Sequence, residues 1–327
     1  MIDPFRARMY RLILGFAAAY NIGFGLWTAL WPRSFFDVFE MAPPRYPSIW
    51  ACLGMVVGLY GAVYALAAAR LHVAKPLVAI GLAGKVLGPA GWLLAVRSGE
   101  WPVRTFTLIT FNDLIWWVPF TLLLLEGTRA GERLRASAPY ACALCNAAGA
   151  LALLAALRPG SEVEPDPARR ALYIAENPGL WRAGWLAWYA AATSLLGFYA
   201  WWAARLPRAA WGIAAWSAAA AGIVCDLLAE SLYIGWLPDR LEQVQRIGTL
   251  LTGGAANGLY TAAGVALTLS TPSLPLPLRV AAWAIWVFGF ALTVSAWAAS
   301  TAGMVVATAG LMALLCPWAW FMGKKLE

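Results

Sequence analysis

Long apolar runs separated by short polar segments make up most of this chain. A helix that crosses a membrane needs about 20 mostly apolar residues, and runs of that length between charges, prolines and glycines predict ten spans. The pattern therefore predicts an all-α protein, a polytopic transmembrane helical bundle. The expected spans are residues 10–31, 47–69, 76–96, 105–125, 138–157, 180–203, 210–235, 248–270, 280–299 and 302–322.

The most polar connection, "EGTRAGERLRASAP", divides these spans into four and six. We expect a four-span membrane domain at residues 1–126, a linker at 127–137 and a six-span membrane domain at 138–327. Two long loops, at residues 33–47 and 160–179, are expected on the side of the membrane opposite to this linker. Each is long enough for a short helix at the membrane interface.

Composition supports a membrane location. Of 327 residues, 62% are hydrophobic and 12% are charged, whereas soluble domains carry about 25% charged residues. The net charge of +8 does not predict nucleic-acid binding, because the basic residues lie at the ends of apolar runs and form no basic face. By the positive-inside rule they place both termini in the cytoplasm. The residues that set this orientation are Arg6, Arg8, Arg11, Arg70, Lys75, Arg129, Arg133 and Arg135.

Cysteine and histidine usage argues against metal and redox chemistry. The five cysteines are odd in number and lie in apolar runs, so a disulfide framework is not expected. His72 is the single histidine, too few for a haem or di-iron site. The sequence also lacks a dinucleotide fingerprint and a P-loop. We expect no metal and no cofactor.

Lys85 lies in the third predicted span, ten residues from Lys75 and twelve from Arg97. Those separations correspond to roughly 15 and 18 Å of helix, which places Lys85 near the middle of the bilayer. Asp113 lies at a similar depth in the fourth span. Since an isolated charge there costs about 2.5–3.5 kcal/mol, we expect Lys85 and Asp113 to form an ion pair, with Asn112 adding a hydrogen bond.

Proline and glycine surround this predicted pair. Pro89 and Pro119 cannot donate to the carbonyls of Lys85 and Ile115, so each span is expected to kink and to leave a free acceptor nearby. Two interpretations remain open: an internal staple between helices, and a polar pocket that receives a ligand or a proton. The same span carries a smooth face that allows close helix approach, formed by Gly81, Gly84, Gly88 and Gly91.

The stronger candidate site lies in the seventh span, where Asp226 and Glu230 are four residues apart and share a helix face. Two carboxylates this close in low dielectric are not expected to ionise together, so one should hold a proton at neutral pH. Such a pair suits a general acid and base or a proton relay. The eighth span offers Asn257 and Tyr260 at a comparable depth, and Arg182 is the nearest candidate partner for the acids.

Three segments of the first half, "RYPSIWACLGMVVGLYGAVYA", "GLAGKVLGPAGW" and "FNDLIWWVPF", resemble a family of small four-span bacterial membrane proteins, DoxX-like in pattern. The resemblance implies a bacterial inner membrane. Members are often labelled alkyl hydroperoxide reductase, but Cys52 lies in an apolar span without a base that would activate its thiol. Residues 138–327 resemble nothing familiar. The matching positions are Tyr20, Asn21, Tyr46, Pro47, Trp50, Cys52, Gly54, Met55, Gly84, Lys85, Gly88, Pro89, Asn112, Asp113, Trp116, Trp117 and Pro119.

Three functional classes follow from these features. The first is binding or movement of a lipid-soluble or small polar molecule through an intramembrane pocket. The second is an integral-membrane enzyme, an isomerase or cyclase acting on an isoprenoid or related lipid, with Asp226 and Glu230 as acid and base. The third is an accessory subunit of a larger membrane complex, which allows for a protein partner or a homo-oligomer as well as membrane lipids. The ligand-binding candidates are Lys85, Asn112, Asp113, Asn257 and Tyr260.

Overall fold

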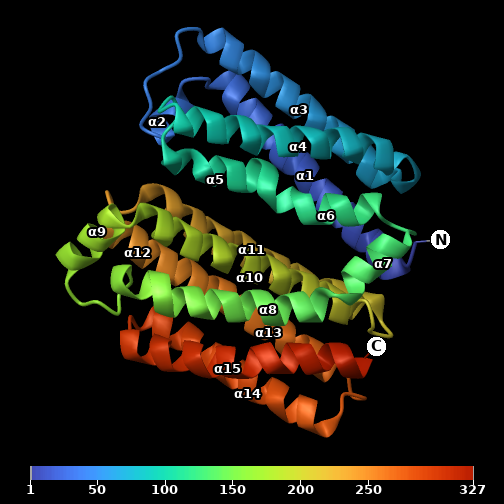
Figure 1. The fold of residues 1–327 in the computed structure, drawn as a ribbon. Helices are drawn as coiled ribbons and strands as arrows, with labels where there is room; N and C mark the ends of the chain where they lie inside the picture. The colour runs from blue at the N-terminus through green and yellow to red at the C-terminus, as the bar shows by residue number, and fades with distance from the viewer. Residues whose placement is uncertain (1, 327) are drawn as a thin grey trace. The chain divides into compact units, whose positions relative to one another are not determined.

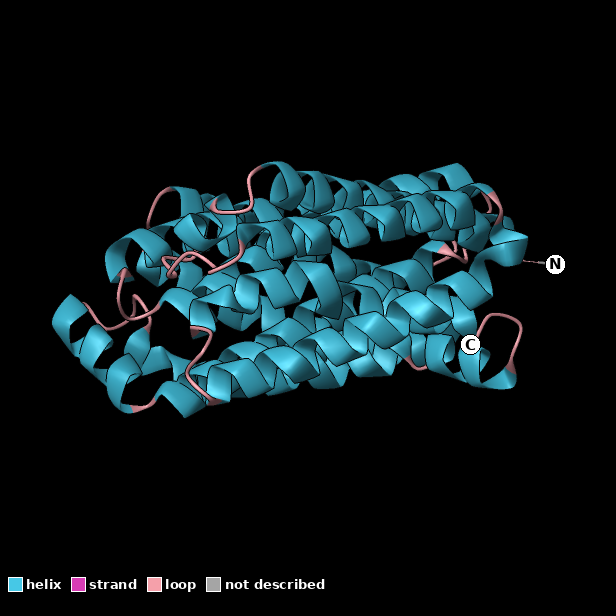
Figure 2. Ribbon diagram, turned by 90° about the horizontal axis from the view of Figure 1, so that it is seen from above, coloured by secondary structure: helices cyan, strands magenta, loops and turns pink. Residues whose placement is uncertain are grey.

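The computed structural model describes residues 2–326, and every regular element in that part of the chain is a helix (Figure 2). The chain divides into two compact units. Unit 1 runs up to Gly131 and unit 2 begins at Glu132, so the boundary lies inside the predicted linker, 127–137.

Unit 1 is a closed four-helix arrangement (Figure 1). Its first long helix packs on the second, the second on the third, the third on the fourth, and the fourth returns to the first. A short helix, α2, lies in the loop at residues 33–47, as expected. The fourth long helix contains a π-helical turn at Thr110–Leu114. The elements are α1 (Pro4–Leu30), α2 (Ser34–Val38), α3 (Pro47–Ala69), α4 (Ala74–Arg97), α5 (Phe106–Ile109) and α6 (Ile115–Leu124).

Unit 2 closes a ring in the same way, with six long helices instead of four. Two of these contain π-helical turns, at Leu153–Leu157 after α8 and at Leu250–Ala256 between α12 and α13. The short α9 occupies the second long loop, again as expected. The elements are α8 (Ala138–Ala152), α9 (Pro167–Glu176), α10 (Pro178–Ala203), α11 (Ala209–Trp236), α12 (Leu241–Thr249), α13 (Asn257–Leu269), α14 (Leu276–Trp297) and α15 (Thr301–Leu326), and α7 (Arg129–Ala136) spans the unit boundary.

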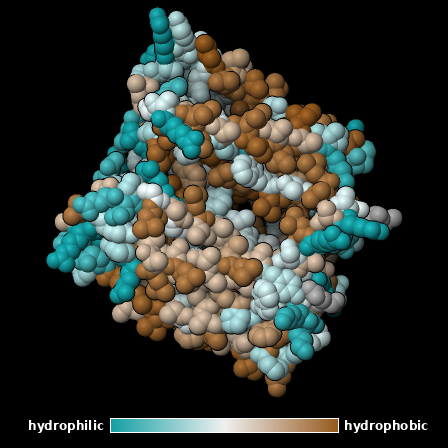
Figure 3. Space-filling view, in the orientation of Figure 1, coloured by the Kyte–Doolittle hydropathy of each residue, from teal (hydrophilic) through white to brown (hydrophobic). Residues whose placement is uncertain are grey.

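Eight helices of the described chain are long and apolar enough to cross a membrane, which makes this a membrane-embedded protein. Two of the ten predicted spans are not among them: α10 and the continuous helix that runs from Leu241 to Leu269. Both have the required length, but tryptophan, threonine and glycine lower their hydropathy. On the face shown in Figure 3, hydrophobic residues cover the middle of the helices and hydrophilic residues gather mainly at the margins.

Helices α1 and α3 approach each other across glycines. A β-carbon added to Gly25 would lie 2.6 Å from the carbonyl oxygen of Gly54 and 2.6 Å from the backbone of Gly58. Gly54 and Gly58 form the small-xxx-small spacing that allows two membrane helices to meet backbone to backbone. Gly23 lies two residues earlier on the same helix and therefore on a different face, and a β-carbon added there has nothing within 4 Å.

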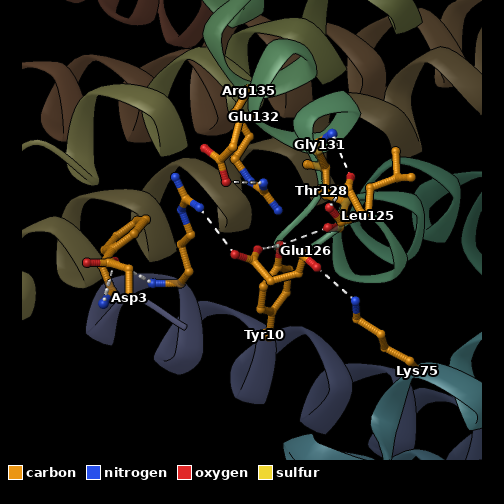
Figure 4. A network of polar contacts seen from close by, with 12 residues as sticks. Asp3, Tyr10, Lys75, Leu125, Glu126, Thr128, Gly131, Glu132 and Arg135 are labelled. Atoms are coloured by element: carbon orange, nitrogen blue, oxygen red, sulfur yellow. Dashed lines mark hydrogen bonds and ion pairs between the residues drawn. The ribbon is translucent and has the colours of Figure 1, made fainter. Parts of the chain in front are cut away.

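A polar network closes one end of unit 1 around Glu126, which joins the ends of three helices (Figure 4). The Glu126 carboxylate accepts from the Tyr10 hydroxyl at 2.8 Å and pairs with the Arg6 guanidinium at 3.2 Å. The Lys75 ammonium donates to the main-chain carbonyl of Glu126 at 2.8 Å. The basic ends of α1 and α4 therefore lie at the same end of the unit, as the charge pattern predicts.

We expect Glu126→Ala to destabilise unit 1 by about 1–3 kcal/mol, because it removes the buried carboxylate that the Tyr10 hydroxyl and the Arg6 guanidinium contact. The Tyr10 hydroxyl then keeps the weaker contact with the Leu122 carbonyl, at 3.1 Å. Glu132→Ala is the matched control, since Glu132 makes an exposed pair with Arg135 three residues later on α7, and such pairs contribute about 0–1 kcal/mol. Thermal unfolding of the purified protein measures both. Equal shifts for the two variants would contradict this account of the network.

Candidate functional site

A cavity of about 240 Å³ lies inside the ring of unit 2, and all six long helices contribute to its wall. Aromatic side chains cover much of that wall, and three acidic side chains interrupt it. The acidic members are Glu162, Asp226 and Glu230, and the aromatic members are Trp181, Trp185, Trp188, Tyr199, Tyr233, Tyr260 and Trp286.

Asp226 is a fully hydrogen-bonded carboxylate, 9% exposed. One of its oxygens accepts from the Thr252 hydroxyl, and the other accepts from the Tyr260 hydroxyl at 3.2 Å. The π-helical turn at Leu250–Ala256 supplies Thr252, and such turns are frequent at functional sites. The α11 and α12–α13 helices therefore meet at this carboxylate.

Glu230 faces the same cavity one turn further along α11, but its environment is different. It is 2% exposed, and its Oε2 atom has no hydrogen-bond partner within the described chain. A buried polar atom without a partner costs about 1–3 kcal/mol. In a native protein such an atom calls for an explanation, such as an ordered water, a catalytic role or a ligand that completes the bonding.

Close packing positions the Tyr260 hydroxyl. A β-carbon at Gly222, one turn before Asp226 on α11, would lie 2.7 Å from the Tyr260 ring, so the glycine leaves room for that ring. The Asn257 amide contacts α14 instead of Asp226: it donates to the Gly289 carbonyl at 2.5 Å and to the Thr293 hydroxyl at 2.9 Å. Asn257 lines the cavity and also ties α13 to α14.

Basic side chains are absent from the wall of this cavity as the described residues form it. Arg182, the predicted partner, does not form an ion pair with Asp226 or Glu230 in residues 2–326. At the end of the cavity beside the 160–179 loop, Glu162 is half-buried and its carboxylate accepts from the Thr249 hydroxyl at 2.8 Å. Within the described residues, the basic group that comes close to this wall is the buried Arg170, whose guanidinium donates to the amide oxygen of Gln245 behind the lining.

In unit 1 the predicted ion pair between Lys85 and Asp113 is not formed: no ion pair within the described residues joins them. The Lys85 ammonium instead donates to the main-chain carbonyl of Asn112, in the π-helical turn Thr110–Leu114. It also lies 5.8 Å from the centre of the Tyr64 ring and 5.7 Å from that of Trp116. The carbonyl in the π turn and the two aromatic rings thus contact the Lys85 ammonium in place of the Asp113 carboxylate.

The free acceptor expected from Pro89 is present and is satisfied. The Trp117 indole donates to the Lys85 carbonyl at 2.8 Å, which links α6 to α4. Asp113 accepts from the Asn112 amide at 3.0 Å and lies against α4 at Gly88, where an added β-carbon would be 2.9 Å from its carboxylate.

The predicted glycine face of α4 is used at only some of its positions. Gly81 and Gly88 accommodate Tyr64 and Asp113, whereas Gly84 and Gly91 have nothing within 4 Å of an added β-carbon. Asn112 and Asp113 also line a cleft within unit 1. The Oδ1 atom of Asn112 is buried without a partner there, so both the staple and the pocket interpretations retain a structural basis.

The structure brings Asp226, Glu230, Asn257 and Tyr260 together in one cavity, and it places Lys85, Asn112 and Asp113 together in unit 1. The sequence-based reasoning missed Thr252. The signal for it was the "TGG" run in the middle of the π turn in the eighth predicted span. It also did not predict that three tryptophans of α10 line the cavity, Trp181, Trp185 and Trp188.

Comparison of this chain with models of known protein families, with characterised proteins and with solved structures finds no match.

Proposed function

We propose that this protein binds, or moves across the membrane, a lipid-soluble or small polar molecule that occupies the cavity of unit 2. One observation carries the proposal: the Glu230 carboxylate is buried, faces the cavity and has no hydrogen-bond partner in the described chain. A ligand with a hydrogen-bond donor would supply the partner that Glu230 lacks. The aromatic wall would hold the apolar part of such a molecule.

Purification in mild detergent, followed by mass spectrometry, tests this proposal. We expect a small molecule to co-purify with the protein and at least nine-tenths of it to be lost in Glu230→Gln, because the amide keeps the size of the side chain but removes its charge. Glu242→Gln, an exposed position on α12, is the control and should retain the molecule. Co-migration with other membrane proteins, with no small molecule bound, would favour an accessory role instead.

A second candidate is an acid–base enzyme acting on an isoprenoid or related lipid. The observation in its favour is the unequal environment of two neighbouring carboxylates, since Asp226 accepts two hydrogen bonds and the Oε2 atom of Glu230 accepts none from residues 2–326. Two carboxyl groups in such different environments take different roles, one as general acid and the other as general base. If the protein is such an enzyme, Asp226→Asn should stop product formation while the ligand stays bound. If the protein only binds the molecule, no product forms.

The membrane arrangement that we propose has ten spans, four in unit 1 and six in unit 2, in a bacterial inner membrane with both termini in the cytoplasm. The closed rings of helices support it, since α10 and the Leu241–Leu269 helix each fill a place between two apolar spans. We also propose that unit 1 is a DoxX-like module. The contacts among Lys85, Gly88, Asp113 and Trp117 support this, because they involve positions that carry the resemblance.

A further inference from the structure

We infer that the cavity of unit 2 takes a protonated amine on an apolar body, an organic monocation. This inference rests on the proposed function and names the chemical class of its ligand. Three observations lead to it: the sign of the charge in the cavity, the aromatic wall and the missing partner of Glu230.

The first observation is the sign of the charge. Glu162, Asp226 and Glu230 line the cavity, and no lysine, arginine or histidine of residues 2–326 does. The donors around Asp226 are neutral hydroxyls, those of Thr252 and Tyr260. A buried carboxyl group that loses water either keeps a proton or pairs with an opposite charge, and an ammonium group on the ligand supplies that charge. An anionic ligand would add a second uncompensated charge.

The second observation is the aromatic wall of the cavity. Trp181 and Trp185 have ring centres 5.7 Å apart, and those of Trp185 and Tyr233 are 4.3 Å apart, so three rings form a continuous surface. Faces of tryptophan and tyrosine attract cations, by about 2 kcal/mol or more when water is excluded. These rings and Glu230 line the same cavity, which matches a ligand that has a positive group and an apolar body.

The third observation is the arrangement of oxygen atoms. Both Asp226 oxygens already accept hydrogen bonds, which leaves Glu230 as the acid of α11 with a vacant acceptor. In residues 2–326, no three side chains of histidine, cysteine, aspartate or glutamate are grouped so that they could hold a metal ion. An ammonium group needs only one free carboxylate, and its apolar body fills the remaining space.

Three probes that share a phenyl body test the inference: 2-phenylethylamine, 2-phenylethanol and 3-phenylpropanoate. Calorimetric titration of the full chain, in nanodiscs of uncharged phosphatidylcholine, measures their affinities without attraction of the amine to anionic lipid. We expect the amine to bind at least tenfold more tightly than the alcohol, and the carboxylate not to bind. Glu230→Gln should remove the tenfold preference, whereas Glu242→Gln should preserve it.

The outcomes separate this inference from the function on which it rests. If the alcohol binds as tightly as the amine, or if Glu230→Gln leaves the preference intact, the cavity binds small molecules but the inference of a cationic ligand is wrong. If no probe binds and no small molecule co-purifies, both the inference and the proposed function are wrong. A circular dichroism spectrum of Glu230→Gln that matches that of the natural protein shows that the variant is folded.

Discussion

Replacing Gly25 with alanine is expected to destabilise unit 1 by about 3 kcal/mol, at the upper end of the usual cost of overpacking. The added methyl group would lie 2.6 Å from backbone atoms of Gly54 and Gly58. Backbone cannot turn away as a side chain can, so α1 and α3 would have to separate along their length. Unfolding of the purified protein in a denaturing detergent, followed by circular dichroism, measures the loss.

Gly23→Ala is the matched control for this experiment, two residues earlier on the same helix. An added β-carbon at Gly23 meets nothing within 4 Å, and alanine is the better helix former by up to about 1 kcal/mol. Gly23→Ala should therefore leave stability unchanged or raise it slightly. Similar losses in both variants would mean that α1 tolerates no substitution in this region, and the glycine contact would not explain the Gly25 result.

The two acids of α11 should affect stability in opposite directions. Glu230→Met is expected to stabilise unit 2 by about 1–2 kcal/mol, because it replaces a buried, unpartnered carboxylate with an apolar chain of similar length. Asp226→Ala is expected to destabilise it by about 1–3 kcal/mol, because the Thr252 and Tyr260 hydroxyls lose their shared acceptor. Thermal unfolding without added ligand measures both changes.

The stabilised Glu230→Met variant should also lose the co-purifying molecule, as sites that carry function commonly cost stability. Tyr260→Phe provides a control for the second acid, since it removes one of the two hydrogen bonds to Asp226 and should cause part of the Asp226→Ala loss. A Glu230→Met variant that is less stable than the natural protein would show that its carboxylate has a partner, and the vacant-acceptor argument would be wrong.

Much of the fold could be predicted from hydrophobic pattern alone. The spacing of apolar runs is set by the thickness of the bilayer, so it locates helices without any knowledge of their neighbours. The count of spans was harder to predict, because the hydropathy of α10 reflects the tryptophans that face the cavity as well as those that face outward.

The candidate site could be predicted where one helix carries it, and not where two helices meet. Asp226 and Glu230 share a face of α11 by regular periodicity, and the structure places both in the cavity. The partner of Lys85 could not be predicted in the same way. It is a main-chain carbonyl in a π turn, and no residue type identifies such a carbonyl in a sequence.

The π turn at Leu250–Ala256 has a consequence for the direction of side chains. In a regular α-helix each residue turns by 100°, so Thr252 and Tyr260, eight residues apart, would point roughly 80° away from each other. A residue in a π turn advances by roughly 20° less, and the run from Thr252 to Ala256 removes about that difference. Both hydroxyls then point in the same direction, and both reach Asp226. The widened turn acts as a rotational adjustment, and without it one carboxylate could not accept from both hydroxyls.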